Sequence, residues 1–291
     1  MKKILITGAT GFIGNDISKR FLEEFKNCKI TIIGRKIKLW NNNIVKKNIK
    51  YFNLSKDNLK KLGNYDYIIH CAALLENKKF ENSWDKYYQS NVIPVYQILK
   101  NINFKKFIFL SSGSIFSSNN SFPNPNNYYG LSKYISEKML EIFSIKKKNK
   151  IIVVRLPVVI GMNSISNIVD KFAKDFVNNK TVKIYGHGKL KRNIIHIEEV
   201  VELITKLTFM KDNKYNFEVF DFGSSNSMNI IDIAFLIKKI TNSKSNIVNI
   251  KNVRRANYNV NININKIKNI MNYKPISTRK SIIKLIEQKY L

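Results

Sequence analysis

The sequence has few cysteines, no long apolar run and few acidic residues, and each shortage excludes a class of protein. Two cysteines, Cys28 and Cys71, cannot build a disulfide framework or a zinc site, so we expect no bound metal. The apolar residues after Met1-Lys2-Lys3 stop at Thr7, too soon for a secretory or membrane-spanning segment. We therefore expect a cytoplasmic protein with no membrane partner.

The shortage of acidic residues leaves a large positive charge. Aspartate and glutamate number 20 against 51 lysines and arginines, for a formal net charge of +31. Such an excess suggests binding to nucleic acid, but the basic residues are spread along the whole chain. Runs such as 259–265 are rich in Asn and Ile, which indicates a codon bias toward Lys, Ile and Asn. No nucleic-acid-binding motif is present, so we expect no specific nucleic-acid partner; the alternative role for the charge is attraction of an anionic substrate.

A glycine-rich turn lies between the apolar run at residues 4–6 and a stretch of helical spacing that begins at Phe12. Glycines at such a turn let the backbone approach a pyrophosphate, and the helix N-terminus supplies N–H donors and a positive dipole. The order of strand, turn and helix predicts that the chain binds a dinucleotide cofactor. The residues expected to contact it here are Gly8, Thr10, Gly11, Phe12, Ile13 and Gly14.

Short apolar runs alternate with amphipathic stretches as far as residue 156, and the pattern loosens after Gly161. This alternation is typical of a parallel sheet covered by helices on both faces. We therefore predict an α/β fold, with a Rossmann-type doubly wound parallel sheet in residues 1–160 and a return segment at about 190–225. Residues 161–189 and 226–291 would form a smaller C-terminal substrate-binding lobe.

A second motif carries residues suited to proton transfer. Tyr129 and Lys133 are four residues apart, on one face of a predicted helix. An ammonium close to a phenol lowers the tyrosine pKa from its ordinary ~10, which suits proton transfer near neutral pH. Just upstream, the strand at 107–111 ends at Ser112, and ligands bind at the carboxyl ends of strands in doubly wound sheets. Ser112, Tyr129 and Lys133 are therefore the predicted catalytic set.

In the same order along the chain, these motifs resemble those of the extended short-chain dehydrogenase/reductase family, which includes nucleotide-sugar epimerases, dehydratases and reductases. Further segments that carry the likeness are Asp66–Ala73, Asn91-Val92, Arg155 with Gly161, Arg192–His196, Arg254-Arg255 and Tyr273-Lys-Pro275. The resemblance implies that Lys133 holds the cofactor ribose and that Asn91 supports the active-site helix. It also implies a nucleotide-sugar substrate whose diphosphate is bound by Arg192 and by Arg254 or Arg255.

The same resemblance implies further contacts and an assembly. The additional residues expected at the cofactor are Asn53, Leu54, Cys71, Ala72, Ala73 and Asn91. The helices at 84–99 and 129–143 would present apolar faces to a second copy in a homodimer, the alternative being that these faces only cover the sheet. The chain departs from the family where Val158 and Ile160 replace Asn and Tyr, and where Asn53, Asn193 and Asn257 replace acids. These changes affect the substrate and adenine contacts, whereas the catalytic set is complete.

The residues after the second predicted strand indicate whether the chain prefers NAD or NADP. Here they are Gly34-Arg35-Lys36, which contain no acid. An acid there accepts hydrogen bonds from the ribose 2′-hydroxyl of NAD, whereas the Arg35 guanidinium suits the phosphate of NADP. The alternative is that Arg35 and Lys36 are solvated. We expect NADP(H), with NAD(H) as the alternative.

A preference for NADP(H) favours net reduction, so we predict a ketoreductase acting on a nucleotide-diphosphate 4-keto-6-deoxy sugar. Tyr129 would give a proton to the ketone oxygen that Ser112 orients, while NADPH delivers hydride to the carbon. A C4 epimerase with bound NAD needs the same three residues and is the alternative. A dehydratase of the family carries an acid pair where this chain has Gly113 and Ser114. A non-catalytic NAD(P)- or nucleic-acid-binding protein is less favoured, because members that abandon catalysis lose the Tyr or the Lys.

Overall fold

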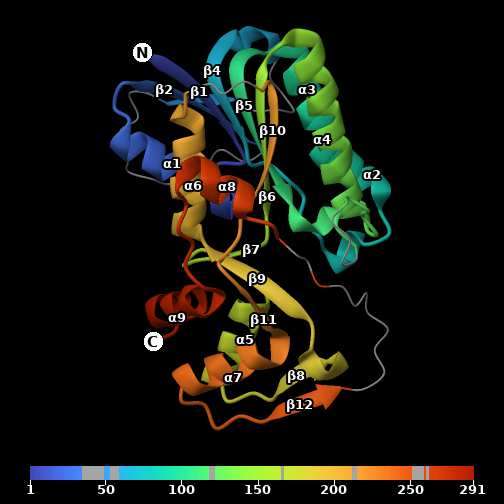
Figure 1. Cartoon of the computed structure of the whole chain (residues 1–291), viewed down its shortest axis with the longest axis vertical. Helices are drawn as coiled ribbons and strands as arrows, with labels where there is room; N and C mark the ends of the chain where they lie inside the picture. Colours follow the sequence, from blue (N-terminus) through green and yellow to red (C-terminus); the bar gives the residue numbers. More distant parts are fainter. Residues whose placement is uncertain are drawn as a thin grey trace. The chain divides into compact units, whose positions relative to one another are not determined.

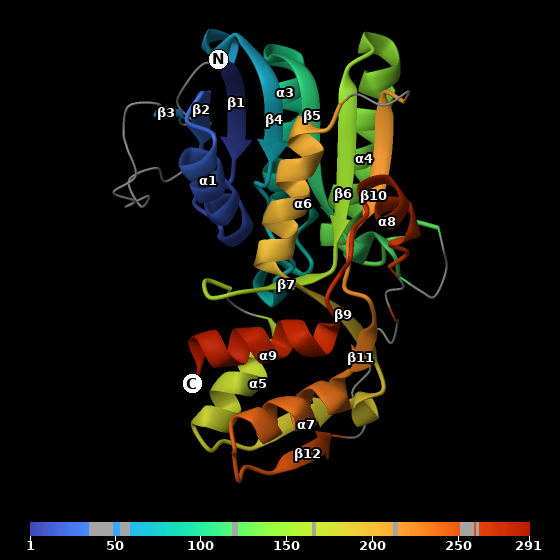
Figure 2. The same ribbon diagram turned by 60° about the vertical axis from the view of Figure 1, so that its left-hand side comes forward.

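The computed structural model describes residues 1–34, 49–52, 59–117, 122–164, 167–211, 215–250, 259 and 262–291. The chain divides into two compact units, drawn in Figures 1 and 2. Unit 1 comprises Met1–Ile115, Pro125–Arg155 and Val201–Phe220. Unit 2 comprises Phe116–Asn124, Leu156–Val200 and Asp221–Leu291.

Unit 1 is built on a seven-stranded sheet with the order β10-β6-β5-β4-β1-β2-β3. β1 pairs in parallel with β2 and with β4, β2 pairs in parallel with β3, and β4 pairs in parallel with β5. The first strand lies inside the sheet and later strands extend it in both directions, which is the doubly wound arrangement. The α/β fold with a Rossmann-type sheet is thereby confirmed. The strands are β1 (Lys2–Thr7), β2 (Cys28–Ile33), β3 (Ile49–Phe52), β4 (Asn64–His70), β5 (Asn103–Ser112), β6 (Lys150–Leu156) and β10 (Phe217–Asp221).

Helices cover both faces of this sheet, with α1 and α6 on one face and α3 and α4 on the other (Figures 1 and 2). The central strands are therefore apolar without alternation, as the fully buried run from Phe107 to Phe109 shows. The aromatic ring of Phe209 on α6 lies 4.5 Å from that of Phe25, just after α1. The helices are α1 (Phe12–Glu24), α2 (Trp84–Tyr87), α3 (Ile93–Asn101), α4 (Tyr128–Lys147) and α6 (Ile197–Phe209).

Unit 2 contains a three-stranded sheet of order β11-β9-β7 and a two-stranded sheet of β12 and β8. Its core is formed by apolar side chains such as Phe172, Ile237 and Leu285, one from each of three helices, α5, α7 and α9. The strands are β7 (Val158–Ile160), β8 (Val182–Tyr185), β9 (Lys191–His196), β11 (Ser227–Asn229) and β12 (Ile247–Ile250). The helices are α5 (Ile168–Val177), α7 (Ile230–Ile240), α8 (Asn265–Met271) and α9 (Thr278–Lys289). In the described parts of both units, no helix is long and apolar enough to cross a membrane.

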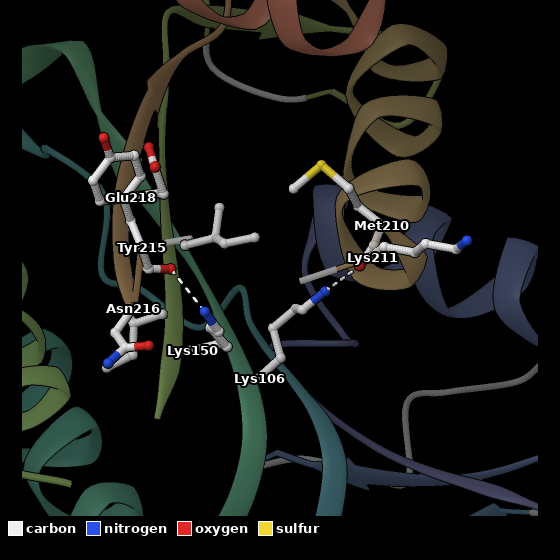
Figure 3. Close-up of a pocket in the computed structure, with 9 residues that line it drawn as sticks. Lys106, Lys150, Met210, Lys211, Tyr215, Asn216 and Glu218 are labelled. Atoms are coloured by element: carbon white, nitrogen blue, oxygen red, sulfur yellow. Dashed lines mark hydrogen bonds between the residues drawn. The ribbon is translucent and has the colours of Figure 1, made fainter. Parts of the chain in front are cut away.

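The end of α6 is tied to the sheet by a buried lysine. The Lys106 ammonium donates to the main-chain oxygens of Leu207, Thr208 and Met210, at 3.5, 3.4 and 2.7 Å. Figure 3 shows Lys106 and Lys150 lining a pocket near the amino ends of β5 and β6, with dashed bonds to main-chain oxygens. The last carbonyl groups of a helix have no partner within it, and a cation there is stabilised by the helix dipole. This pocket lies at the amino ends of β5 and β6, whereas Ser112 is at the carboxyl end of β5. Lys106 serves there as a C-terminal cap of α6.

We predict that Lys106→Met lowers the free energy of unfolding by about 1–3 kcal/mol, because buried carbonyl oxygens lose their donor. Urea denaturation of the purified protein measures this loss. Lys105→Met is the matched control: its side chain is 78% exposed and pairs with Asp66 at the surface, so a smaller loss is expected. Equal losses in the two variants would contradict the capping role.

Candidate active site

The turn between β1 and α1 is closed by glycines that cannot be replaced without moving the backbone. Gly8 has a φ of +72°, and a Cβ atom built there would lie 2.6 Å from the Ala72 nitrogen. A Cβ atom on Gly14 would lie 2.3 Å from the Gly8 oxygen. The Cys71 amide donates to the Thr7 oxygen at 3.2 Å. The glycine turn is therefore packed directly against the segment that follows β4.

The same turn fits the phosphates of a dinucleotide. Gly11 is the N-cap of α1, in extended conformation, and its position provides no side-chain acceptor for the first amide groups of the helix. Thr10 and Gly11 are exposed on the turn, whereas Phe12 and Ile13 are half-buried. An exposed backbone that ends at a helix N-terminus offers N–H donors and a positive dipole to a pyrophosphate. The glycine turn that the sequence predicts between the first strand and the first helix is present in unit 1.

His70, at the end of β4, is a buried neutral imidazole. Its Nδ1 atom lies 3.0 Å from the Thr7 hydroxyl, which also accepts a hydrogen bond from the Ala72 amide at 3.3 Å. Burial, and secondarily the Lys133 charge, lowers the His70 pKa to about 3. Burial raises the pKa of the neighbouring Cys71 thiol to about 12. His70 and Cys71 are thus uncharged near neutral pH, and the described residues contain no group of three or more metal-binding side chains.

Asn91 ties the segment after β4 to helix α4. It lies in a π-helical turn at Tyr88–Val92, an irregularity that often occurs at functional sites. Its side-chain oxygen accepts a hydrogen bond from the Leu74 amide at 2.7 Å. Its side-chain nitrogen donates to the Leu74 oxygen at 3.1 Å and to the Ser132 hydroxyl at 2.8 Å. Asn91 therefore fixes Cys71–Leu74 relative to the helix that carries Tyr129 and Lys133.

The predicted catalytic hydroxyls meet at the carboxyl end of β5. The Ser112 hydroxyl lies close enough to the Tyr129 phenol to favour its ionised form, and it accepts a hydrogen bond from the Ser114 amide at 3.1 Å. Burial raises the pKa of Tyr129 to about 12, although the nearby Ser112 hydroxyl acts in the opposite direction. The Lys133 ammonium lies 4.5 Å from the ring centre of Phe109, and burial lowers its pKa to about 8. The sequence-based expectation of a lowered Tyr129 pKa was therefore wrong, because burial of the phenol, helped by the charge of Glu76, outweighs the effect of Ser112.

Two residues that the sequence analysis did not single out bring α4 to this position. Asn127 is the N-cap, and its side-chain oxygen accepts a hydrogen bond from the Gly130 amide at 2.7 Å. A Cβ atom on Gly130 would lie 2.1 Å from the Ser114 oxygen, so only glycine permits this approach. A glycine inside a predicted helix costs stability, and that cost is the signal that could have identified Gly130.

Several predicted site residues lie outside the described residues, and Arg192 belongs to unit 2. Arg35, Asn53, Leu54, Arg254 and Arg255 lie outside the described residues. Arg192 lies on β9 in unit 2, where its guanidinium donates to the Lys191 oxygen at 2.9 Å.

One departure from the family pattern has a structural role in unit 2. Asn193 accepts a hydrogen bond from the Ser224 amide at 2.9 Å and donates to the oxygens of Ser224 and Asn226, both at 3.2 Å. This residue therefore joins β9 to the loop before β11.

A Rossmann-type sheet with a glycine-lined first turn and a Ser, Tyr and Lys after β5 defines an enzyme of the extended short-chain dehydrogenase/reductase type. The chain belongs to the NAD dependent epimerase/dehydratase family, whose model matches residues 4–223. It is 30% identical over 277 residues to the dTDP-D-glucose 4,6-dehydratase of Dictyostelium discoideum, an alignment covering 83% of this chain and 62% of that protein.

Solved structures show the same fold. The UDP-glucuronic acid 4-epimerase of Bacillus cereus, in complex with UDP-glucuronic acid and NAD, matches with a TM-score of 0.84 at 21% identity, over 98% of this chain and 99% of that one. The UDP-N-acetylglucosamine 4-epimerase of Methanobrevibacter ruminantium, in complex with UDP-N-acetylmuramic acid, matches with a TM-score of 0.83 at 23% identity, over 98% and 97%. At these identities the two structures establish the fold.

We predict that buried His70 makes the protein less stable in acid. Its folded pKa of about 3 lies below the ordinary 6.5, so the unfolded chain binds a proton that the folded chain does not. The free energy of unfolding should fall as the pH is lowered from 6.5 toward 3, by at most about 1.4 kcal/mol per pH unit from this group. Urea denaturation between pH 7 and pH 4 should show a weaker dependence in His70→Gln. His187 is exposed, so His187→Gln is the control. Identical pH dependences in the wild type and His70→Gln would refute the claim that His70 destabilises the folded protein in acid.

Proposed function

We propose that the chain is a nucleotide-sugar 4-epimerase whose chemistry is carried out by Ser112, Tyr129 and Lys133. The observation that carries the proposal is the proximity of the Tyr129 phenol to the Ser112 hydroxyl at the carboxyl end of β5, with Lys133 one helical turn after Tyr129. Family membership supports this choice, as do the two 4-epimerases with the same fold. Gly113 and Ser114 follow Ser112 with no acid, which argues against the dehydratase reaction.

The residues proposed to hold the nicotinamide cofactor are the glycine turn and the segment after β4. A bound nicotinamide dinucleotide supplies a reversible acceptor and donor of hydride. Its binding residues would be Gly8, Thr10, Gly11, Phe12, Ile13, Gly14, Cys71, Ala72, Ala73, Asn91, Tyr129 and Lys133, with Arg35, Asn53 and Leu54 at the adenosine end. NAD(H) is the form bound in the Bacillus cereus structure, and we propose it for the epimerase.

The side chains of the catalytic set have different roles toward one oxygen of the sugar. The Tyr129 hydroxyl exchanges a proton with that oxygen, and Ser112 orients it by a hydrogen bond. With a pKa of about 12, the Tyr129 phenol is protonated near neutral pH and ready to donate to a ketone. In the opposite direction the phenolate is needed, and the positive charge of Lys133, one helical turn from Tyr129, would stabilise it. Burial of Tyr129 and Lys133 keeps competing water away from the reacting oxygen.

The substrate is proposed to be a hexose linked to a nucleoside diphosphate. Arg192, with Arg254 or Arg255, would bind the diphosphate, because guanidinium groups bind phosphate in a fork geometry. Binding of this remote group holds the sugar in position for reaction at C4. The net charge of +31 favours approach of such an anion.

An NADP-dependent ketoreductase acting on a nucleotide-diphosphate 4-keto-6-deoxy sugar is the second candidate. Two observations favour it: no acid occurs in Gly34-Arg35-Lys36 after β2, and Tyr129 rests in the proton-donating form. The two candidates share the catalytic set and differ in whether the coenzyme is recycled or consumed.

The test is turnover of UDP-, dTDP-, CDP- and GDP-linked hexoses and 4-keto-6-deoxy hexoses, with the coenzyme followed by absorbance. The epimerase interconverts C4 epimers without net change at 340 nm, and NAD is released when the protein is denatured. Tyr129→Phe should lose about 10²–10⁴-fold in turnover. Tyr128→Phe is the matched control, since this neighbouring residue is 39% exposed. Stoichiometric oxidation of NADPH would favour the reductase, and full activity in Tyr129→Phe would refute both.

We also propose that the chain forms a homodimer through α3 and α4. These helices leave apolar side chains in contact with water, including Tyr96 at 45%, Ile142 at 54% and Ile145 at 72% exposure. Exposed apolar patches of this kind are typical of subunit interfaces. Light scattering after gel filtration should give twice the mass of one chain, and Ile142→Glu/Ile145→Glu should give one. Phe235→Glu on α7 is the control, and an unchanged mass in the double variant would contradict this interface.

A further inference from the structure

Unit 1 contains a buried charged cluster next to the proposed catalytic set. Glu137 on α4 is 2% exposed. One oxygen of its carboxylate accepts a hydrogen bond from the Ser111 hydroxyl at 2.5 Å and one from Arg155 Nε at 3.2 Å. The other oxygen accepts from Arg155 Nη2 at 2.7 Å. The carboxylate is thus held by a bidentate contact with the Arg155 guanidinium and by the Ser111 hydroxyl. Hydrogen bonds of this charged, bidentate kind are stronger than those between neutral groups.

This cluster connects the three elements that build the site. Ser111 is the neighbour of Ser112 at the end of β5, and Arg155 lies near the end of β6. Glu137 follows Lys133 by one helical turn and Tyr129 by two, which places the three side chains along one side of α4. A shift of α4 along the sheet would break the contacts of Glu137 with both strands. Glu137 therefore fixes the position of Tyr129 relative to Ser112.

The same carboxylate lies within electrostatic reach of Lys133. Lys133 is 2% exposed and faces the Phe109 ring from β5, with His70 and Cys71 at the end of β4 also within electrostatic reach. Burial lowers the Lys133 pKa to about 8, while the negative charge of Glu137 acts to raise it. His70 is neutral at this pH, and the Cys71 thiol, with a pKa of about 12, is also uncharged. Glu137, which is paired with Arg155, is therefore the negatively charged residue that acts on Lys133.

We propose that Glu137 is a positioning residue of the catalytic set, which holds α4 against β5 and β6 and sets its carboxylate within electrostatic reach of Lys133. The assignment rests on the proposed function, because its consequence is expressed through Tyr129 and Lys133. The Glu137–Lys133 coupling itself can be measured without substrate.

The direct test is a pH titration of the protein labelled with ¹³C at the lysine ε carbon, followed by NMR. Lys133 should titrate near pH 8, separate from the exposed lysines, and Lys133→Arg identifies its signal. In Glu137→Gln the midpoint should move to lower pH by about 1 unit, the effect expected from losing a nearby opposite charge. Glu141→Gln is the matched control, since Glu141 lies one turn further along α4 in an exposed pair with Lys138. An unchanged midpoint in Glu137→Gln would overturn the proposal.

Glu137→Gln leaves Arg155 without its carboxylate and can fail to fold, so Glu137→Gln/Arg155→Gln is measured as well. A smaller downward shift is expected in the double variant, because loss of the Arg155 charge partly offsets loss of the carboxylate, and a midpoint that moves to higher pH there would overturn the proposal. In turnover, the alkaline limb of the kcat profile should move to lower pH with the Lys133 midpoint, whereas a purely structural loss lowers kcat equally at every pH. A wild type that turns over no nucleotide sugar would refute the proposed function, while the titration would still decide the role of Glu137.

Discussion

The candidate site depends on how closely α4 lies against the turn after β5. The absence of a side chain at Gly130 permits this approach, since a Cβ atom there would lie 2.1 Å from the Ser114 oxygen. The approach brings the Tyr129 phenol to the Ser112 hydroxyl and buries both Tyr129 and Lys133. Burial then sets the protonation of the site: it raises the pKa of Tyr129 and lowers that of Lys133. Ser112 acts against the shift of Tyr129, and the Glu137 charge acts against that of Lys133.

A second close contact joins the catalytic residues to the predicted cofactor cradle. The glycine turn after β1 packs closely against the Cys71–Ala72 backbone, and Asn91 hydrogen-bonds both to the segment after β4 and to Ser132 on α4. The turn, the end of β4 and the helix of Tyr129 are therefore parts of one packed framework in unit 1. Substitutions at Gly8 or Gly130 should disturb both the cradle and the catalytic set, even though neither residue has a side chain that could react.

The sequence predicted the fold because its signals are local and repeated. The apolar run at 4–6, the glycine turn and the alternation of strands and helices each carry the expected pattern, and the structure confirms the Rossmann-type sheet. The grouping of Ser112 with Tyr129 was predictable from the strand end and the helix spacing. The pKa of Tyr129 was not, because burial depends on packing between distant segments. Glu137 was missed for the same reason: its partners Ser111 and Arg155 are 26 and 18 residues away and meet it only in the folded chain.

We propose that the site of Ser112, Tyr129 and Lys133 oxidises and then reduces the same carbon of a nucleotide sugar, with the hydride returned to that carbon. The most direct measurement is the fate of deuterium placed at C4 of a UDP-hexose that the protein turns over. The account predicts that the product is the C4 epimer and keeps the deuterium at C4. Deuterium found in water or in free coenzyme would contradict it.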